Sequence, residues 1–274
     1  MIVINNGVMP DACVLAIGKF ESIHLGHRAL LAEVVRQADL LNLASAVMVF
    51  DPHPYIFLSD PGYKPLFTND ERNHLLDDKR LFCDVQKQIM LRGLDYLYYC
   101  PFDENFASLS PDDFCKFIFV DCKAKLVIIG ENYRFGKDRT GDTAFLQSAA
   151  RQYDAKIQTL PIKNTNDSII CTSNIRTLIA EGKLKEARQL LGFPFFSMGI
   201  IENENDDLNI HVSEKKFLPL DGIYCSNTII AGAIYRSTTT VEPRVKTRIH
   251  DYKLKGLVGA PVKIEFIDTI PSGE

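Results

Sequence analysis

Two histidines spaced three residues apart are the first side chains whose types and positions favour chemistry. His24 and His27, with Gly26 between them, follow the apolar run Ala12–Ile17 and open a helical pattern. Residues three apart share a helix face, and the free N–H groups of a helix N-terminus favour phosphate oxygens. Glycine lets a ligand approach the backbone closely. The pair therefore predicts hydrogen bonds to a nucleotide phosphate, although a metal site or a chance pairing fits the same residues.

Three later segments place polar residues, glycines or prolines after short apolar runs. Phe50–Pro54 carries two prolines that stiffen a loop rim. Gly130–Gly136 flanks polar and aromatic residues with glycine, which suits a planar ligand and a phosphate. In Thr172–Arg176, Ser173 is a candidate N-cap and Arg176 falls in the first helical turn, an arrangement that suits pyrophosphate. Plain alternatives remain: a strand-ending turn, a glycine loop and ordinary helix capping.

These motifs lie within an alternation of strand-length and helical patterns. A helix is predicted over His27–Leu41, with a buried stripe of Leu30, Leu31, Val34, Val35, Ala38 and Leu41. The order strand, helix, strand predicts a parallel sheet covered by helices. In such a sheet ligands bind at the carboxyl ends of the strands, where the motifs stand. The predicted strands are Ala12–Ile17, Ala46–Phe50, Tyr96–Cys100, Leu126–Ile129 and Ile157–Leu160, and a helix pair follows at Ser173–Ala180 and Leu184–Leu191.

The pattern changes after Phe193-Pro194 to short alternating segments separated by turn residues. Alternation of this kind predicts a small antiparallel β-barrel, and we place the boundary near 190–196. The predicted barrel strands are Phe196–Glu202, Leu208–Val212, Gly222–Thr228, Ile230–Tyr235, Lys246–His250 and Val262–Ile267.

Composition sets the class of molecule. The chain has 274 residues, 46% of them hydrophobic and 24% charged, which are ordinary globular values. With 31 basic and 35 acidic residues, the net charge of −4 provides no surplus to hold a nucleic-acid backbone. Seven cysteines without a CxxC pair favour reduced, buried thiols in a cytoplasmic protein. No uncharged apolar run approaches the ~20 residues that span a bilayer, so neither nucleic acid nor a membrane is expected as a partner.

In this order the four motifs resemble the nucleotidyltransferase domain of bacterial bifunctional riboflavin kinase/FAD synthetases. That family carries G-x-F-D-G-x-H-x-G-H, F-x-P-H-P, G-x-[DN]-[FY]-x-[FY]-G and S-S-T-x-I-R. The matching segments are Gly18–His27, Phe50–Pro54, Gly130–Gly136 and Cys171–Arg176, and the similarity covers most of residues 10–194. The departures from the family pattern are Lys19, Glu21, Ser22 and Cys171, which replace Asn, Asp, Gly and Ser.

The resemblance implies a Rossmann-like α/β nucleotidyltransferase domain over 1–194, followed by a small antiparallel barrel over 195–274. It implies adenylyl transfer from ATP to FMN, giving FAD and pyrophosphate, with Mg²⁺ accompanying ATP and no protein metal ligand identified. The implied catalytic residues are His24, His27 and Arg176. The implied nucleotide and phosphate contacts are Gly18, Phe20, Gly26, Asn132, Thr172 and Ser173, and the implied flavin contacts are His53, Pro54, Tyr133, Arg134 and Phe135.

The barrel resembles the kinase domain of that family only in outline. Leu218–Tyr224 matches its L-P-x-D-G-x-Y strand entry, but the stretch Ile200–Asp207 stands where a G-F-P-T-A-N loop binds ATP and metal. Lys246 aligns with the catalytic Glu, and Glu242 is the nearest carboxylate. A protonated lysine cannot act as a general base. Riboflavin kinase activity is therefore expected to be lost.

Three further functions stay open on the residues. The same histidine motif serves adenylyl- and cytidylyltransferases that act on nicotinamide mononucleotide, phosphopantetheine or glycerol phosphate. Alternatively, the altered Glu21, Ser22 and Cys171 positions suit a paralogue that binds flavin without catalysis. A bifunctional enzyme that keeps its kinase activity is the third alternative.

Overall fold

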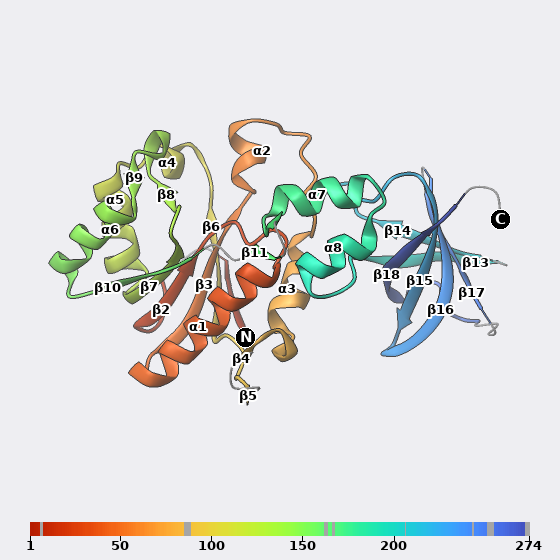
Figure 1. The fold of residues 1–274 in the computed structure, drawn as a ribbon, viewed down its shortest axis with the longest axis horizontal. Helices are drawn as coiled ribbons and strands as arrows, with labels where there is room; N and C mark the ends of the chain where they lie inside the picture. The colour runs from red at the N-terminus through yellow and green to blue at the C-terminus, as the bar shows by residue number, and fades with distance from the viewer. Residues whose placement is uncertain are drawn as a thin grey trace. The chain divides into compact units, whose positions relative to one another are not determined.

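The chain divides into two compact units (Figure 1). The computed structural model describes residues 1–5, 8–84, 89–161, 164–165, 168–205, 207–242, 244–250 and 255–271. The first unit comprises Met1–Tyr63 and Asn73–Asn164, and the second comprises Lys64–Arg72 and Thr165–Glu274. Within the described residues, no helix has both the length and the apolar character needed to cross a bilayer.

A six-stranded parallel sheet forms the centre of the first unit, with the strand order β1-β6-β3-β2-β7-β10. Its inner strands are almost entirely buried, as expected when helices cover both faces. All five strands predicted for this region are confirmed, whereas β1 was not predicted, because it is a short, mostly exposed edge strand. The strands are β1 (Ile2–Asn5), β2 (Cys13–Ile17), β3 (Ala44–Asp51), β6 (Tyr96–Pro101), β7 (Ala124–Gly130) and β10 (Lys156–Leu160).

Helix α1 (Leu25–Leu41) starts two residues before the predicted position and packs against β2 and β3. Its predicted stripe is buried from Leu30 through Ala38. Leu41, also predicted in the stripe, is 48% exposed. That prediction was wrong because the helix ends at once, at the left-handed residue Asn42, and the sheet does not cover its last turn.

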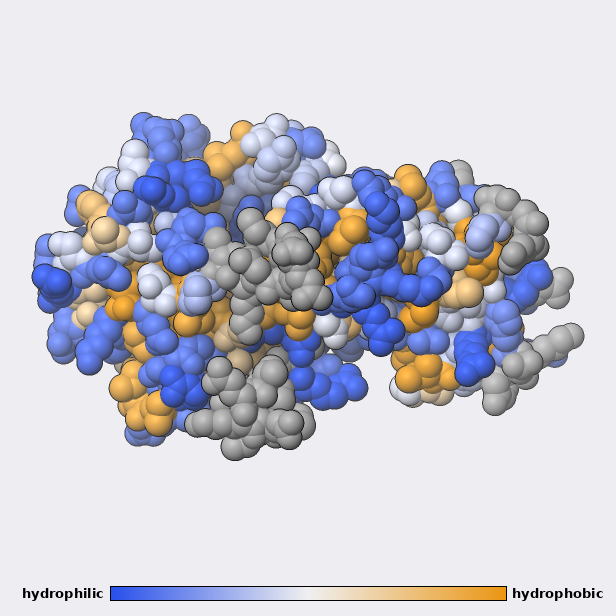
Figure 2. Space-filling view, viewed as in Figure 1, coloured by the Kyte–Doolittle hydropathy of each residue, from blue (hydrophilic) through white to orange (hydrophobic). Residues whose placement is uncertain are grey.

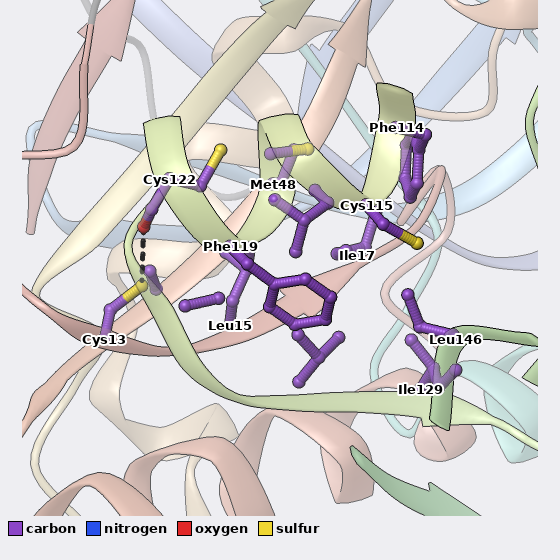
Figure 3. Close-up of a cluster of buried hydrophobic side chains, with 14 of the residues drawn as sticks. Cys13, Leu15, Ile17, Met48, Phe114, Cys115, Phe119, Cys122, Ile129 and Leu146 are labelled. Carbon is purple, nitrogen blue, oxygen red and sulfur yellow. Dashed lines mark hydrogen bonds between the residues drawn. The ribbon is translucent and has the colours of Figure 1, made fainter. Parts of the chain in front are cut away.

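The first unit also has a core built partly from cysteines (Figure 3). Cys13, Cys100 and Cys115 are buried among aliphatic and aromatic side chains, and burial raises the pKa of each thiol to about 12. The Cys13 thiol donates to the carbonyl of Cys122, 3.4 Å away. These four residues are free thiols, as the sequence predicted.

Shorter elements complete the first unit and its connections. They are α2 (Pro54–Leu58), α3 (Asn69–Asp77), α4 (Glu104–Ala107), α5 (Pro111–Lys116), α6 (Thr143–Ala150), the single turns Lys79–Leu81, Phe117–Asp121, Lys137–Arg139 and Arg151–Tyr153, and the two-residue strands β4 (Cys83–Asp84), β5 (Ile89–Met90), β8 (Arg134–Phe135) and β9 (Gly141–Asp142).

The second unit contains a closed antiparallel barrel with the strand order β13-β14-β17-β16-β15-β18, which confirms the predicted class. Helices α7 (Thr172–Ala180) and α8 (Leu184–Leu191) belong to this unit, and α8 packs on β18. The barrel strands are β13 (Phe196–Glu204), β14 (Leu208–Val212), β15 (Gly222–Ile230), β16 (Ala233–Val241), β17 (Val245–Ile249) and β18 (Pro261–Ile270), and the short pair β11 (Asn164–Thr165) and β12 (Ser168–Ile169) precedes α7.

Two sequence boundaries differ from the structure. The predicted strand Ile230–Tyr235 straddles a hairpin turn, because Ala231 and Gly232 both adopt positive φ and reverse the chain there. The compact units also do not coincide with the ranges 1–194 and 195–274, since α7, α8 and Lys64–Arg72 cluster with the barrel. The assignment of separate activities to those two ranges stays a prediction.

Hydrophilic side chains cover much of the face shown in Figure 2, with apolar residues interspersed among them. The largest exposed apolar fractions include Leu40 at the end of α1 and Ile234 beside the β15–β16 turn, at 67% and 68%. Scattered apolar residues of this kind are normal on a protein surface.

Candidate active site

The loop between β2 and α1 places both histidines of the first motif at the carboxyl edge of the parallel sheet. His24 is the N-cap of α1, and its Nδ1 accepts the backbone N–H of His27 at 3.1 Å. Because Nδ1 acts as an acceptor, a neutral His24 ring carries its proton on Nε2. The cap therefore leaves His24 with one N–H donor on the ring atom remote from the helix.

The two imidazoles stack face to face, with ring centroids 3.7 Å apart and planes inclined by 6°. Burial lowers the pKa of His24 to about 4. Burial, together with the neighbouring His24 and the Lys19 ammonium, holds the pKa of His27 well below its usual range. Both rings are therefore neutral near pH 7, and they can donate to phosphate oxygens as uncharged imidazoles.

His27 has a feature that packing alone does not explain. Its Nδ1 is buried and has no hydrogen-bond partner within the part of the chain that the structure describes. Nearly all buried polar atoms in native proteins have a partner, so this atom is available to a bound group. The ring is held in place by the stack on His24 and by Phe20, whose centroid lies 5.0 Å away.

Gly26 has a packing role in this arrangement. A Cβ atom at residue 26 would lie 3.1 Å from Cε1 and 3.2 Å from Nδ1 of His24. Glycine therefore makes room for the stacked imidazole. Gly18, at the other end of the loop, donates its N–H to the Met48 carbonyl at 3.3 Å, which ties the loop to β3.

The same loop contains backbone strain. Phe20 and Ile23 adopt φ values of 43° and 45°, in the left-handed region that side-chain-bearing residues avoid. Such conformations cost on the order of 1–3 kcal/mol each and persist only where surrounding contacts enforce them. Both side chains are fully buried, which supplies part of that constraint.

Glu21 lies between these two strained residues, and its contacts with the second motif also help to hold the loop in this conformation. Its carboxylate accepts the Tyr63 hydroxyl at 2.9 Å and lies 3.2 Å from Nε2 of His53. His53 is the N-cap of α2, where its Nδ1 accepts the Tyr55 N–H at 3.2 Å, and Pro54 is the first helical residue. The Glu21 and His53 side chains are 3% and 6% exposed. The first two motifs are thus joined by a buried polar cluster, and the flavin contacts expected of His53 and Pro54 stay predictions.

The third motif follows β7 as a tight turn, in which the Tyr133 N–H donates to the Gly130 carbonyl. Asn132 is exposed at this turn, so its side chain is accessible. Arg134 is also exposed, with Nη1 3.4 Å from the Asp142 carboxylate. Phe135 is 5% exposed and packs on Phe114.

The buried position of Phe135 gives it a role in the hydrophobic core, where Tyr133 packs beside it. Gly141 has a related role, because a Cβ there would lie 2.7 Å from the Phe135 ring. The expected flavin contacts of Tyr133, Arg134 and Phe135 stay predictions.

The fourth motif forms the start of α7 in the second unit. Ser173 was predicted as the N-cap, and this was wrong: Cys171 takes the extended N-cap conformation and makes no side-chain cap bond. Thr172 and Ser173 fall in the first turn, and the Ser173 hydroxyl lies 3.1 Å from the Cys171 thiol. Arg176 follows within the next turn and donates from Nη2 to the Lys64 carbonyl at 2.6 Å.

The structure thus brings together Gly18, Phe20 and His24 in the β2–α1 loop with Gly26 and His27 in the first turn of α1. Glu21 and Tyr63 are site-supporting residues that sequence reasoning missed. One indication of this role was present in the sequence, because Glu21 replaces the Asp that is usual in the family. Nothing in the sequence indicates that Glu21 contacts Tyr63. Among the residues that the structure describes, no group of three or more His, Cys, Asp or Glu side chains forms a metal site.

The lowered pKa of His24 predicts how the free energy of unfolding depends on pH. A histidine whose folded pKa lies below its unfolded value binds more protons when unfolded, so the free energy of unfolding rises with pH between about 4 and 6.5. His24→Asn keeps a good N-cap residue and removes this titration. We expect urea unfolding of the variant to show a flatter dependence on pH across this window. His211→Asn, at an exposed histidine of the barrel, is the control, and equal slopes for His24→Asn and the unmodified chain would contradict the prediction.

A stacked histidine pair at a helix N-terminus, at the carboxyl edge of a parallel α/β sheet, is an arrangement that suits a nucleotide phosphate. The comparisons with known proteins specify the group. The family model for FAD synthetase matches residues 8–174, and this chain belongs to that family. It is accordingly a nucleotidyltransferase enzyme.

Individual relatives agree with that assignment. An FAD synthetase from Listeria monocytogenes serovar 1/2a is 28% identical over 235 residues, which cover 84% of this chain and 87% of the relative. A bifunctional riboflavin kinase/FMN adenylyltransferase from the same bacterium is 30% identical, with coverage of 83% and 71%. The corresponding bifunctional protein of Bacillus subtilis (strain 168) is 26% identical, with coverage of 94% and 84%.

A solved structure shows the same fold. A crystal structure described as a macrolide-efflux protein from Streptococcus pneumoniae superposes with a TM-score of 0.82 at 25% identity. The match covers 100% of this chain and 92% of the other. The parallel sheet followed by a barrel is therefore an arrangement found in a solved protein.

Proposed function

We propose that this protein is an FMN adenylyltransferase, which joins the AMP part of ATP to FMN and releases pyrophosphate. The observation that carries the proposal is the stacked, neutral pair of His24 and His27 in the family's first motif. Membership of the FAD synthetase family supports FMN and ATP as the substrates.

The chemistry needs no covalent enzyme intermediate. A phosphate oxygen of FMN attacks the α-phosphorus of ATP, a new P–O bond forms, and the bond to the bridging oxygen of pyrophosphate breaks. Negative charge builds on the oxygens of the α-phosphate during this exchange. Donors held in advance at those oxygens stabilise the transition state without reorganisation. We assign this role to His24 and His27, because the N-cap bond and the ring stack hold both imidazoles before substrate arrives.

We assign phosphate binding to Thr172, Ser173 and Arg176 of α7, together with Asn132 after β7. Hydroxyls and N–H groups in the first turn of a helix suit phosphate oxygens, and a guanidinium binds them through parallel hydrogen bonds. Mg²⁺ neutralises part of the triphosphate charge when it accompanies ATP. Mg²⁺ bound with ATP usually takes most of its ligands from the phosphates and water, and only one or two from the protein.

We further propose that riboflavin kinase activity is absent. Where the family's ATP loop is expected, β13 and β14 form an antiparallel ladder instead. Two carboxylates in this stretch have structural partners: Glu204 accepts the N–H groups of Gly256 and Leu257, each at 2.7 Å, and Asp207 pairs with Arg248. Lys246 is exposed on β17, between two buried residues, and carries no carboxylate to serve as a base.

The decisive experiment compares substrates. The purified chain is given MgATP with FMN, riboflavin, nicotinamide mononucleotide, phosphopantetheine or glycerol phosphate, and products are separated by chromatography. We expect FAD and pyrophosphate from FMN, and no FMN or FAD from riboflavin. Steady product from riboflavin would refute the loss of kinase activity. Glu242→Gln would then test whether Glu242 is the base of the kinase reaction. Retention of FMN without FAD would favour the non-catalytic, flavin-binding alternative.

We also propose a cytoplasmic location. The buried, unpaired thiols of Cys13, Cys100, Cys115 and Cys122 support it, because reduced cysteines of this kind are usual in a reducing compartment.

A further inference from the structure

Arg176 is held on two sides by residues that lie far from it in the sequence. Its guanidinium carbon lies 4.1 Å from the centre of the Phe217 ring, and its Nη2 donates to the Lys64 carbonyl at 2.6 Å. All three residues belong to the second unit. Together the two contacts restrict the positions that the guanidinium can take.

The segments that carry the Phe217 ring and the Lys64 carbonyl are hydrogen-bonded to each other. The Phe217 N–H donates to the Pro65 carbonyl at 3.1 Å, so the ring and the Lys64 carbonyl are carried by hydrogen-bonded neighbours. One residue earlier, the Lys216 ammonium donates to the Leu66 carbonyl and lies 2.8 Å from the Glu71 carboxylate. The segment 64–66 is therefore paired with residues 216–217 of the connection between β14 and β15.

The anchor of this pairing is deeply buried. The Lys216 and Glu71 side chains are 0% and 1% exposed. The ammonium also lies 4.3 Å and 4.5 Å from the ring centres of Phe67 and Phe195. Glu71 in turn accepts the backbone N–H groups of Thr68 and, on β13, Met198. The support beneath Arg176 is thus part of the packed interior of the second unit.

We propose that Phe217 is a positioning residue for adenylyl transfer, which holds the Arg176 guanidinium in the orientation that binds the phosphates of ATP. The inference rests on the proposed function of Arg176. An arginine side chain loses rotational freedom when it binds phosphate, and a side chain that is already oriented loses less. The barrel then contributes to the transferase reaction, because its β14–β15 connection carries Phe217.

The test is a double-mutant cycle on the full chain. Phe217→Leu removes the aromatic face and keeps apolar bulk, Phe217→Tyr keeps the face, and Arg176→Ala removes the guanidinium. We expect Phe217→Leu to raise the KM for MgATP about fivefold, with the KM for FMN unchanged and Phe217→Tyr near the unmodified value. In the Arg176→Ala background, Phe217→Leu should have no further effect, because the residue acts through the guanidinium.

Phe193→Leu is the matched control. Phe193 packs on Phe67 and Phe196 in the same unit, with ring centres 5.9 Å and 6.3 Å apart, so it reports the effect of losing a ring from this interior. Equal, independent effects of Phe217→Leu with and without Arg176 would overturn the proposal, as would an equal rise in KM for Phe193→Leu. Should Phe217→Leu fail to fold, Phe217→Met replaces it in the same cycle.

The outcome is separable from that of the proposed function. If the unmodified chain forms no FAD from FMN, the same cycle is measured by calorimetry as the dissociation constant for MgATP. Coupling between residues 217 and 176 in that constant would support the positioning role, and its absence would refute it.

Discussion

His27→Ala is expected to lower the rate of FAD formation from FMN and MgATP at least ~100-fold. A preorganised donor to a transition-state oxygen contributes roughly 2.7–4 kcal/mol to catalysis, which corresponds to a factor of about 10²–10³. The substitution also removes the ring on which His24 stacks at 3.7 Å, so the remaining imidazole loses its support. Initial rates at saturating substrate, with FAD quantified by chromatography, measure the loss.

Binding of FMN should change little in this variant, because the assigned role of His27 is on the α-phosphate of ATP. Flavin fluorescence reports that binding, and thermal unfolding checks that the fold is intact. His211→Ala, at an exposed histidine on β14, is the matched control and should keep normal activity. Near-normal turnover by His27→Ala would remove the residue from the mechanism.

Lys216→Met is expected to lower the free energy of unfolding by about 3–5 kcal/mol, the usual cost of leaving one member of a buried ion pair without its partner. The Glu71 carboxylate would remain 1% exposed, with two backbone N–H groups but no cation. The ammonium is also removed from among three phenylalanine rings. Urea unfolding measures the change.

The adjacent Lys215 is exposed, so Lys215→Met is the matched control and should change stability by less than about 0.5 kcal/mol. Adding Glu71→Gln to Lys216→Met removes the unpaired charge and should restore part of the lost stability. A loss below 1 kcal/mol in Lys216→Met would mean that water reaches Glu71, and the ion pair would no longer explain how residues 64–72 are attached.

Local patterns in the sequence determined the architecture. Runs of Val, Ile and Tyr at strand length predicted five strands of the parallel sheet, and strict alternation predicted the barrel, because side-chain periodicity follows from backbone geometry. The histidine pair could also be predicted from the sequence, because residues three apart at the start of a helix are neighbours in any fold. Errors appeared where local signals are weak: Ala231 adopts positive φ within an apolar run, and Cys171 caps α7 although Ser173 is the better capping residue.

What the tertiary structure decided is the set of contacts between distant segments. Glu21 meets Tyr63 across 42 positions, Arg176 meets Lys64 across 112, and Lys216 meets Leu66 across 150. Phe135, a predicted flavin contact, also packs in the core of the first unit, which no local pattern indicated. No periodicity connects such pairs, because they form only when the elements within each unit pack and each buried polar group must find a partner. The sequence thus identified the residues to which we assign the chemistry, and tertiary packing determined which residues hold them in place.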